Sequence, residues 1–145
     1  MNMKRIVCIL FSLIMLSLTG CSTKVIYELR EPQENIKSIE IGMSISQGNL
    51  RSFETRKELS KQEISDFLNC FANIEFGRYY LGDPMSVGGL TVRITYNDES
   101  CEKICYHWSQ YEKDGDIYDI WRYCEKEDFE SLISKFYDIE SDDES

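Results

Sequence analysis

The stretch SIEIGMSI, residues 38–45, alternates apolar residues with small or polar ones without interruption. A period of two places all of its apolar side chains on one face of an extended strand. The next four residues, 46–49, have turn chemistry, and Leu50–Thr55 is predicted as the return strand. The stretch therefore predicts the first hairpin of an antiparallel sheet with one buried face.

Further strands are predicted downstream of this hairpin. Leu90–Tyr96 alternates in the same way, and the segments 102–112 and 117–124 flank the sequence KDGD, which is a strong hairpin signal. Residues 74–80 are a further possible strand, and the glycine-rich segment 81–89 is predicted as a loop.

Two helices are predicted, one before and one after these strands in the sequence. In the sequence LSKQEI, Ser60 as N-cap and Glu63 three residues later form a capping box, and the helix is expected to run to about Ala72. The second helix is predicted over 125–137, where the apolar residues have helical spacing. Strands joined by hairpins and covered by two helices indicate an α+β fold. We expect one domain, residues 38–138, with an antiparallel sheet of five to six strands and both helices packed on one face.

The N-terminus has the features of an export signal. Lys4 and Arg5 precede a short apolar run that ends in Leu18-Thr19-Gly20-Cys21. This tetrapeptide resembles the lipobox of bacterial lipoproteins. The resemblance implies a signal peptide over residues 1–20, a diacylglycerol on the Cys21 sulfur and a location on the extracytoplasmic face of a membrane. An ordinary secretory signal and an uncleaved membrane helix are the alternatives.

Two acyl chains suffice to hold a protein on a bilayer, so no other membrane contact is required. We expect a polar tether over residues 21–37, although Val25-Ile26-Tyr27 could form a short strand instead, and a disordered acidic tail over 139–145. The pattern as a whole resembles small lipoproteins of unknown function from Gram-positive bacteria. That resemblance supplies an address and no site.

The charge of the chain limits its partners. Its formal net charge is −10, and residues 1–20 contain two bases and no acid, so the mature chain is more acidic still. This excess argues against nucleic acid and against anionic lipid headgroups as direct ligands.

The cysteines divide by location. Cys8 leaves with the signal peptide and Cys21 is lipidated, which leaves four cysteines in an exported domain, typical of disulfides. A hairpin centred on Asp114-Gly115 places Cys105 directly opposite Cys124, and this pair is predicted to bond. Cys70 and Cys101 are then the second predicted pair.

The chain also contains residue types that bind metals or act in catalysis, and simpler explanations account for each of them. Cys101, Cys105, His107 and Cys124 are residue types that bind zinc, but a Cys-x2-Cys knuckle is missing, and so we predict no metal site. The single histidine, His107, is expected on the solvent face beside Cys105 and Cys124. The carboxylate pairs Asp114/Asp116 and Glu127/Asp128 are explained by turn and helix-start preferences.

We therefore expect no catalytic residue and no cofactor. The expected function is that of a lipid-anchored envelope module without enzymatic activity, which binds a protein or peptide partner. Four tyrosines are candidates for a binding patch if they are exposed: Tyr79, Tyr80, Tyr111 and Tyr118. The alternative is a small envelope hydrolase that uses a carboxylate pair.

Overall fold

The computed structural model describes residues 25–47, 50–77, 89–120 and 122–139. Its main sheet has six antiparallel strands in the order β3-β2-β5-β6-β7-β8. Their bounds are β2 Ile36–Gln47, β3 Leu50–Glu58, β5 Gly89–Tyr96, β6 Cys101–Cys105, β7 Trp108–Lys113 and β8 Asp116–Ile120. With helices α2, Lys61–Phe71, and α3, Lys126–Ile133, this confirms the predicted α+β class.

The alternating stretch 38–45 lies in the middle of β2. Ile39 and Ile41 are fully buried, whereas Ile45 is 42% exposed because the strand runs past the helices. A register shift falls between Ile41 and Gly42 in the β2–β3 pairing. A Cβ at Gly42 would lie 2.1 Å from the Glu54 carbonyl oxygen, so this close approach of the two strands requires glycine.

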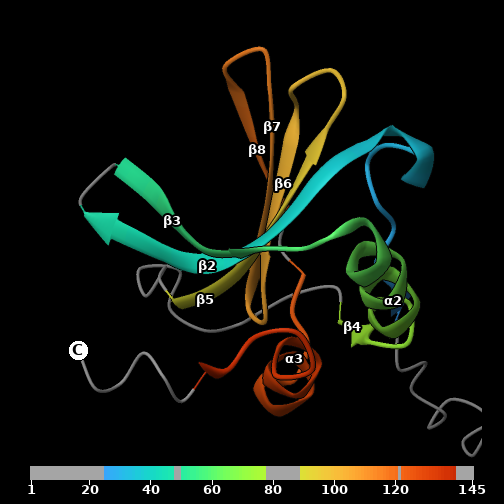
Figure 1. The fold of residues 1–145 in the computed structure, drawn as a ribbon. Coiled ribbons are helices and arrows are strands. Elements are labelled where there is room, and N and C mark those ends of the chain that lie inside the picture. The colour runs from blue at the N-terminus through green and yellow to red at the C-terminus, as the bar shows by residue number, and fades with distance from the viewer. Residues whose placement is uncertain (1–24, 48–49, 78–88, 121, 140–145) are drawn as a thin grey trace, which may run out of the picture.

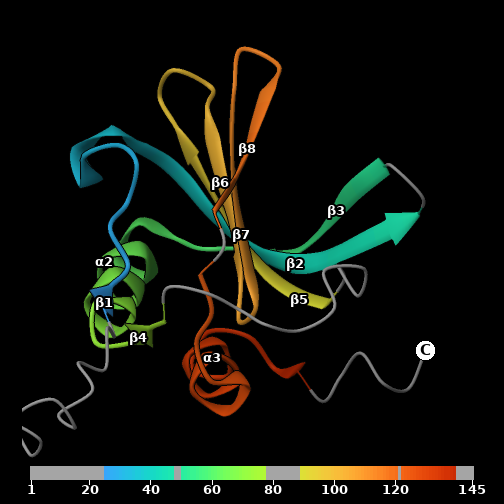
Figure 2. The same ribbon diagram turned by 180° about the vertical axis from the view of Figure 1, so that it is seen from behind.

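Both helices lie on the same side of the strongly twisted sheet (Figures 1 and 2). Phe67 and Phe71 of α2 pack into the core beside Phe129, Leu132 and Ile133 of α3. The turn between β6 and β7 points toward α3, whereas the turn between β7 and β8 projects from the opposite end of the sheet. None of the described helices is long and apolar enough to cross a membrane.

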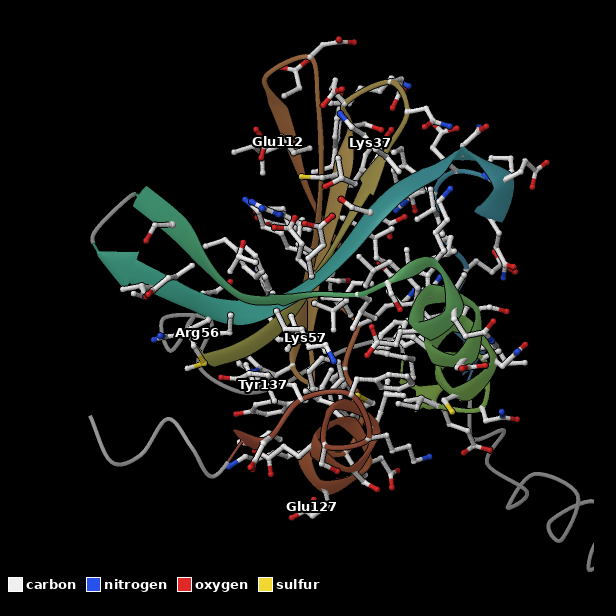
Figure 3. All side chains as sticks on the ribbon, viewed as in Figure 1. Lys37, Arg56, Lys57, Glu112, Glu127 and Tyr137 are labelled. Carbon is white, nitrogen blue, oxygen red and sulfur yellow. The ribbon has the colours of Figure 1, made fainter. Side chains whose placement is uncertain are left out.

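The capping box at the start of α2 is present. The Ser60 side chain accepts from the Glu63 backbone N–H, and the Glu63 carboxylate accepts from the Ser60 N–H at 2.8 Å. Glu63 also binds Lys57 Nζ at 2.6 Å, and Lys57 donates to the Phe136 carbonyl at 2.7 Å. Figure 3 shows the labelled Lys57 between β3 and the segment after α3 that contains Tyr137. Lys57 therefore ties a sheet edge to both helical segments.

The predicted tether over residues 21–37 needs correction from residue 25 onward. Strand β1, Val25–Ile26, pairs with β4, Glu75–Phe76, and Tyr27 is buried in the core. A 3₁₀ turn, η1, spans Gln33–Asn35 and leads directly into β2. The alternative of a short strand at Val25-Ile26-Tyr27 is therefore confirmed for Val25–Ile26, although so short an apolar segment shows no period that could have favoured it over a tether. Residues 140–145 of the predicted tail lie outside the described residues.

Two predictions about strand registers differ from the structure. The hairpin centred on Asp114-Gly115 is confirmed, with Tyr111 opposite Tyr118. The expected single strand over 102–112 is wrong, because the chain turns back at residues 106–107 and splits it into β6 and β7. Matching the apolar residues of the two strands predicted Ile94 opposite Ile104, whereas in the structure Val92 lies opposite Ile104, a shift of two residues. Because the shift is an even number of residues, Ile104 stays on the buried face, as predicted.

Candidate functional site

The structure brings Cys105, His107 and Cys124 together at the β6–β7 turn. Cys105 ends β6, and its Sγ lies 3.8 Å from His107 Nδ1. The Cys124 backbone N–H donates to the Tyr106 carbonyl at 2.6 Å, which holds the segment before α3 against this turn. Cys105 lies near enough to Cys124 to influence its thiol electrostatically. The two cysteines do not meet as a cross-strand pair, since Cys105 lies opposite Trp108.

All three side chains are buried, at 3% exposure for Cys105, 4% for Cys124 and 5% for His107. The prediction that they occupy the solvent face is therefore wrong. Burial, together with the neighbouring Cys105, raises the pKa of the Cys124 thiol to about 12. A thiol with so high a pKa is protonated at neutral pH and is a poor nucleophile. This arrangement is suited to a structural role.

Cys70 and Cys101 do not form the second predicted pair. Glu102 faces the helices, since it binds the buried Tyr27, and its neighbour Cys101 therefore points to the opposite face of β6. Cys70 is on α2, where its sulfur lies 4.0 Å from Lys135 Nζ. The sheet separates the two sulfur atoms. All four cysteines among the described residues are free thiols in the structure. The lipidation candidate Cys21 lies outside the described residues.

Metal binding has little support in this cluster. Within the described part of the chain, no group of three or more His, Cys, Asp or Glu side chains is arranged as metal ligands. Cys101, the fourth residue in the zinc hypothesis, lies on the other side of the sheet from the helices. Burial raises the pKa of its thiol, which further disfavours a thiolate ligand.

The most buried polar cluster surrounds Glu102, which sequence reasoning did not single out. Its carboxylate accepts hydrogen bonds from the Tyr27 hydroxyl at 2.7 Å, from the Tyr96 hydroxyl and from the Arg30 backbone N–H at 2.6 Å. Burial, followed by the nearby Glu102 charge, raises the pKa of both tyrosines well above the ordinary value. The available signal was an acidic residue in phase with the inward-facing Ile104. These contacts fasten the N-terminal segment to the sheet.

The outer face of the sheet, opposite the helices, carries a second polar cluster. Arg93 donates to Glu40 through Nε at 2.8 Å and Nη2 at 2.6 Å, and its guanidinium lies 4.5 Å from the centre of the Phe53 ring. Burial raises the pKa of Glu40, but hydrogen bonds from Arg93 and Thr55 outweigh this and leave the pKa below its usual value. Because these groups satisfy one another, the cluster is suited to joining β2, β3 and β5.

A surface groove of about 620 Å³ lies at the end of α3 and is lined by two carboxylates, Glu130 and Asp138. A glycosidase-type pair needs one carboxyl kept protonated by burial. Asp138 is exposed, and Glu130 is paired with Lys126 at 3.4 Å. The serines of this groove have no histidine nearby, since the single histidine is in the core. The groove therefore lacks the arrangement that the hydrolase hypothesis requires.

The β7–β8 hairpin exposes two large apolar side chains that are adjacent in sequence, whereas the other two described ones, Ile26 and Ile45, lie on separate strands. Ile117 is 59% exposed and Tyr118 is 54% exposed, both on the last strand of the sheet. The Tyr118 ring lies 6.2 Å from that of the half-buried Tyr111. Tyr79 and Tyr80, the other members of the predicted patch, lie outside the described residues. In Figure 3 the labelled Glu112 marks this hairpin at the end of the molecule opposite Glu127 of α3.

Comparison with known proteins adds no further constraint on the site. No family model, curated protein or solved structure matches the chain. The described residues thus contain two polar clusters in the core, around Glu102 and around Cys105, one on the outer face between Arg93 and Glu40, and the exposed β7–β8 hairpin.

Proposed function

We propose that this protein is a lipid-anchored extracytoplasmic module that binds a protein or peptide partner through its β7–β8 hairpin, without catalysis. The anchor rests on Leu18-Thr19-Gly20-Cys21, which resembles a lipobox. The observation that carries the binding role is the exposure of Ile117 and Tyr118 on a hairpin that projects away from both helices. Aromatic side chains are enriched at protein interfaces.

The proposed anchor would present this hairpin outward. Tyr27 is buried and β1 begins at Val25, so only four residues separate the proposed anchor at Cys21 from the first described strand. Four extended residues span at most about 14 Å. In Figure 2, β1 lies beside α2, whereas the β7–β8 turn is at the far end of the sheet. A short connection to the anchor would therefore keep the end of the domain that contains α2 nearest the membrane. The hairpin then faces away from the lipid.

We further propose that Cys105 and Cys124 form a disulfide in the exported protein. Their segments are already joined by the bond from Cys124 N–H to the Tyr106 carbonyl. Exported proteins meet oxidising conditions, in which such pairs bond. The two thiols lose two protons and two electrons to the disulfide of an envelope thiol oxidant, which is reduced to its dithiol.

Two measurements in a bacterial host that processes lipoproteins test the main proposal. The full chain is labelled with an alkyne analogue of palmitate, and the label is expected to be lost in Cys21→Ala. A photo-crosslinking amino acid at Tyr118 is expected to join the protein to a partner in native membranes, while the same group at the exposed Ser65 of α2 gives no such product. Unchanged labelling of Cys21→Ala overturns the anchor. Equal crosslinking from both positions, or none, overturns the binding role.

A further inference from the structure

The two edge strands of the six-stranded sheet, β3 and β8, differ in how well they are protected against pairing with another strand. Among the described residues β8 pairs only with β7, and at the other end β3 pairs only with β2. An end strand presents unpaired backbone groups, and proteins usually guard such edges with charged residues, prolines or bulges. Exposed charges on β3 include Glu54, Arg56 and Glu58, and its pairing with β2 has an irregular register. This edge is guarded in the usual way.

Strand β8 has fewer of these protections, because its only charged residues are the acids Asp116 and Asp119. Its sequence DIYDI contains no lysine, arginine or proline, and its register with β7 is regular over five residue pairs. Asp116 and the three residues after it are all exposed, including the apolar Ile117 and Tyr118. An edge strand with a regular register, no basic residue or proline and exposed apolar side chains favours the addition of another strand.

The turn fixes which backbone groups of β8 face outward. Asp114 and Gly115 both have positive φ, 54° and 85°, which is typical of a two-residue type I′ turn. In such a hairpin the pair that flanks the turn, Lys113 and Asp116, exchanges hydrogen bonds, and alternate pairs do so thereafter. Ile117 falls between two hydrogen-bonded pairs. Its N–H and C=O therefore point away from β7, toward the open edge.

The charge of the hairpin selects the kind of strand that fits there. It contains four acidic side chains, Glu112, Asp114, Asp116 and Asp119, against the single base Lys113. Lys113 is already bound to Asp98 at 2.8 Å. A second copy of the chain would bring like charges together, in a protein whose net charge is −10. Basic side chains would instead meet complementary charge.

We propose that an extended segment of a partner protein, with lysine or arginine at alternating positions, pairs with β8 as a seventh strand. This inference rests on the proposed function and specifies how the hairpin binds. Backbone hydrogen bonds to Ile117 supply the pairing, and the acidic side chains supply selectivity for a basic segment.

The test uses the full chain in zwitterionic detergent and a blocked octapeptide in which lysine and threonine alternate. The matched probes replace lysine by glutamate, or keep lysine and carry N-methyl groups on alternate amides. The lysine peptide is expected to bind at least about tenfold more tightly than either control, because the controls lose charge complementarity or backbone hydrogen bonding. Nuclear magnetic resonance should place the largest shift changes at Ile117 and its neighbours. Equal binding of the three peptides overturns the proposal.

A pair of substitutions at one position separates backbone pairing from side-chain contact. Ile117→Pro removes an N–H that faces the open edge and leaves the β7 ladder intact, whereas Ile117→Ala keeps it. The proline variant is expected to weaken peptide binding about fivefold or more, and the alanine variant less than about threefold. Equal effects overturn strand addition. A dimer that Ile117→Pro dissociates also overturns it, in favour of a second copy. Crosslinking from Tyr118 without peptide binding overturns this inference and leaves the proposed function standing.

Discussion

The Tyr27 hydroxyl donates to Glu102 Oε2 at 2.7 Å, and this bond joins residues that are 75 positions apart. Tyr27 lies near the start of the described chain, and Glu102 is on β6 in the middle of the sheet. The Tyr27 ring also packs 5.1 Å from Phe76 and 5.5 Å from Phe71, so one side chain connects the N-terminal segment, α2 and the sheet. A pull on the N-terminus of the domain is therefore resisted by its core.

Removal of either partner should destabilise the fold. Tyr27→Phe is expected to lower the free energy of unfolding by about 1.5–3 kcal/mol, because it removes a hydrogen bond to a buried carboxylate. Glu102→Ala should cost at least as much, since it leaves two buried tyrosine hydroxyls without their acceptor. Urea unfolding followed by tryptophan fluorescence measures both. The matched control is Tyr118→Phe, at an exposed tyrosine, which should change stability by less than about 0.5 kcal/mol. Equal effects at positions 27 and 118 would contradict this role for Tyr27.

The same cluster predicts a loss of stability in alkali. Burial and the Glu102 charge raise the pKa of Tyr27 and Tyr96 in the folded chain, whereas tyrosines of the unfolded chain ionise near pH 10. Above about pH 10 the unfolded state therefore binds fewer protons, and stability falls as pH rises. Each tyrosine contributes a slope that is small at pH 9 and approaches about 1.4 kcal/mol per pH unit at pH 11. Denaturant unfolding between pH 9 and 11 should show a shallower decline for Tyr96→Phe than for the unchanged protein. An identical decline in the two proteins would contradict the prediction that Tyr96 ionisation contributes to the loss of stability.

Local patterns predicted those elements whose signals lie within a few residues. The alternation of residues 38–45 predicted β2, and Ser60 with Glu63 predicted the start of α2, because each signal reflects the geometry of the element itself. The Asp114-Gly115 turn could be predicted in the same way, because those residues tolerate positive φ. The exposed Tyr118 of the candidate site follows from this hairpin, although its exposure depends on how far the strands run past the helices.

Features that depend on residues far apart in the sequence could not be predicted from local patterns. The turn at Tyr106 and His107 contains no glycine, proline, asparagine or aspartate, so the strand pattern continued through it without a signal. That missed turn placed Cys105, His107 and Cys124 on the wrong face. The buried position of Tyr27 depends on Glu102, 75 residues away, and no local period could reveal that pairing.

The ion pair between Lys57 of β3 and Glu63 of α2 predicts a measurable shift in the titration of Glu63. The hydrogen bond from Lys57, followed by that from the Ser60 N–H, lowers the pKa of Glu63 to about 2. A carboxyl with a lowered pKa contributes stability above its unfolded value, near pH 4.3, and that contribution is lost as pH falls toward 2. Lys57→Met should raise the pKa of Glu63, though not to the ordinary value, because the Ser60 contact remains. Carbon-detected magnetic resonance of the Glu63 carboxyl measures this shift directly. Lys126→Met, on α3, is the control and should leave the pKa unchanged; an equal shift in both variants would contradict the assignment.

The proposed disulfide can be tested on the exported full chain. Alkylation in denaturant without reductant, followed by mass spectrometry, should find a linked Cys105–Cys124 peptide and alkylated Cys70 and Cys101. Closing the loop between the linked cysteines should stabilise the fold by about 3 kcal/mol relative to the reduced chain. The loss on reduction should disappear in Cys124→Ala and persist in Cys70→Ser, because the sheet separates Cys70 from Cys101. Alkylation of Cys105 and Cys124 in the exported chain would show that the pair stays reduced, and a Cys70–Cys101 peptide would contradict the opposite placement of those two side chains.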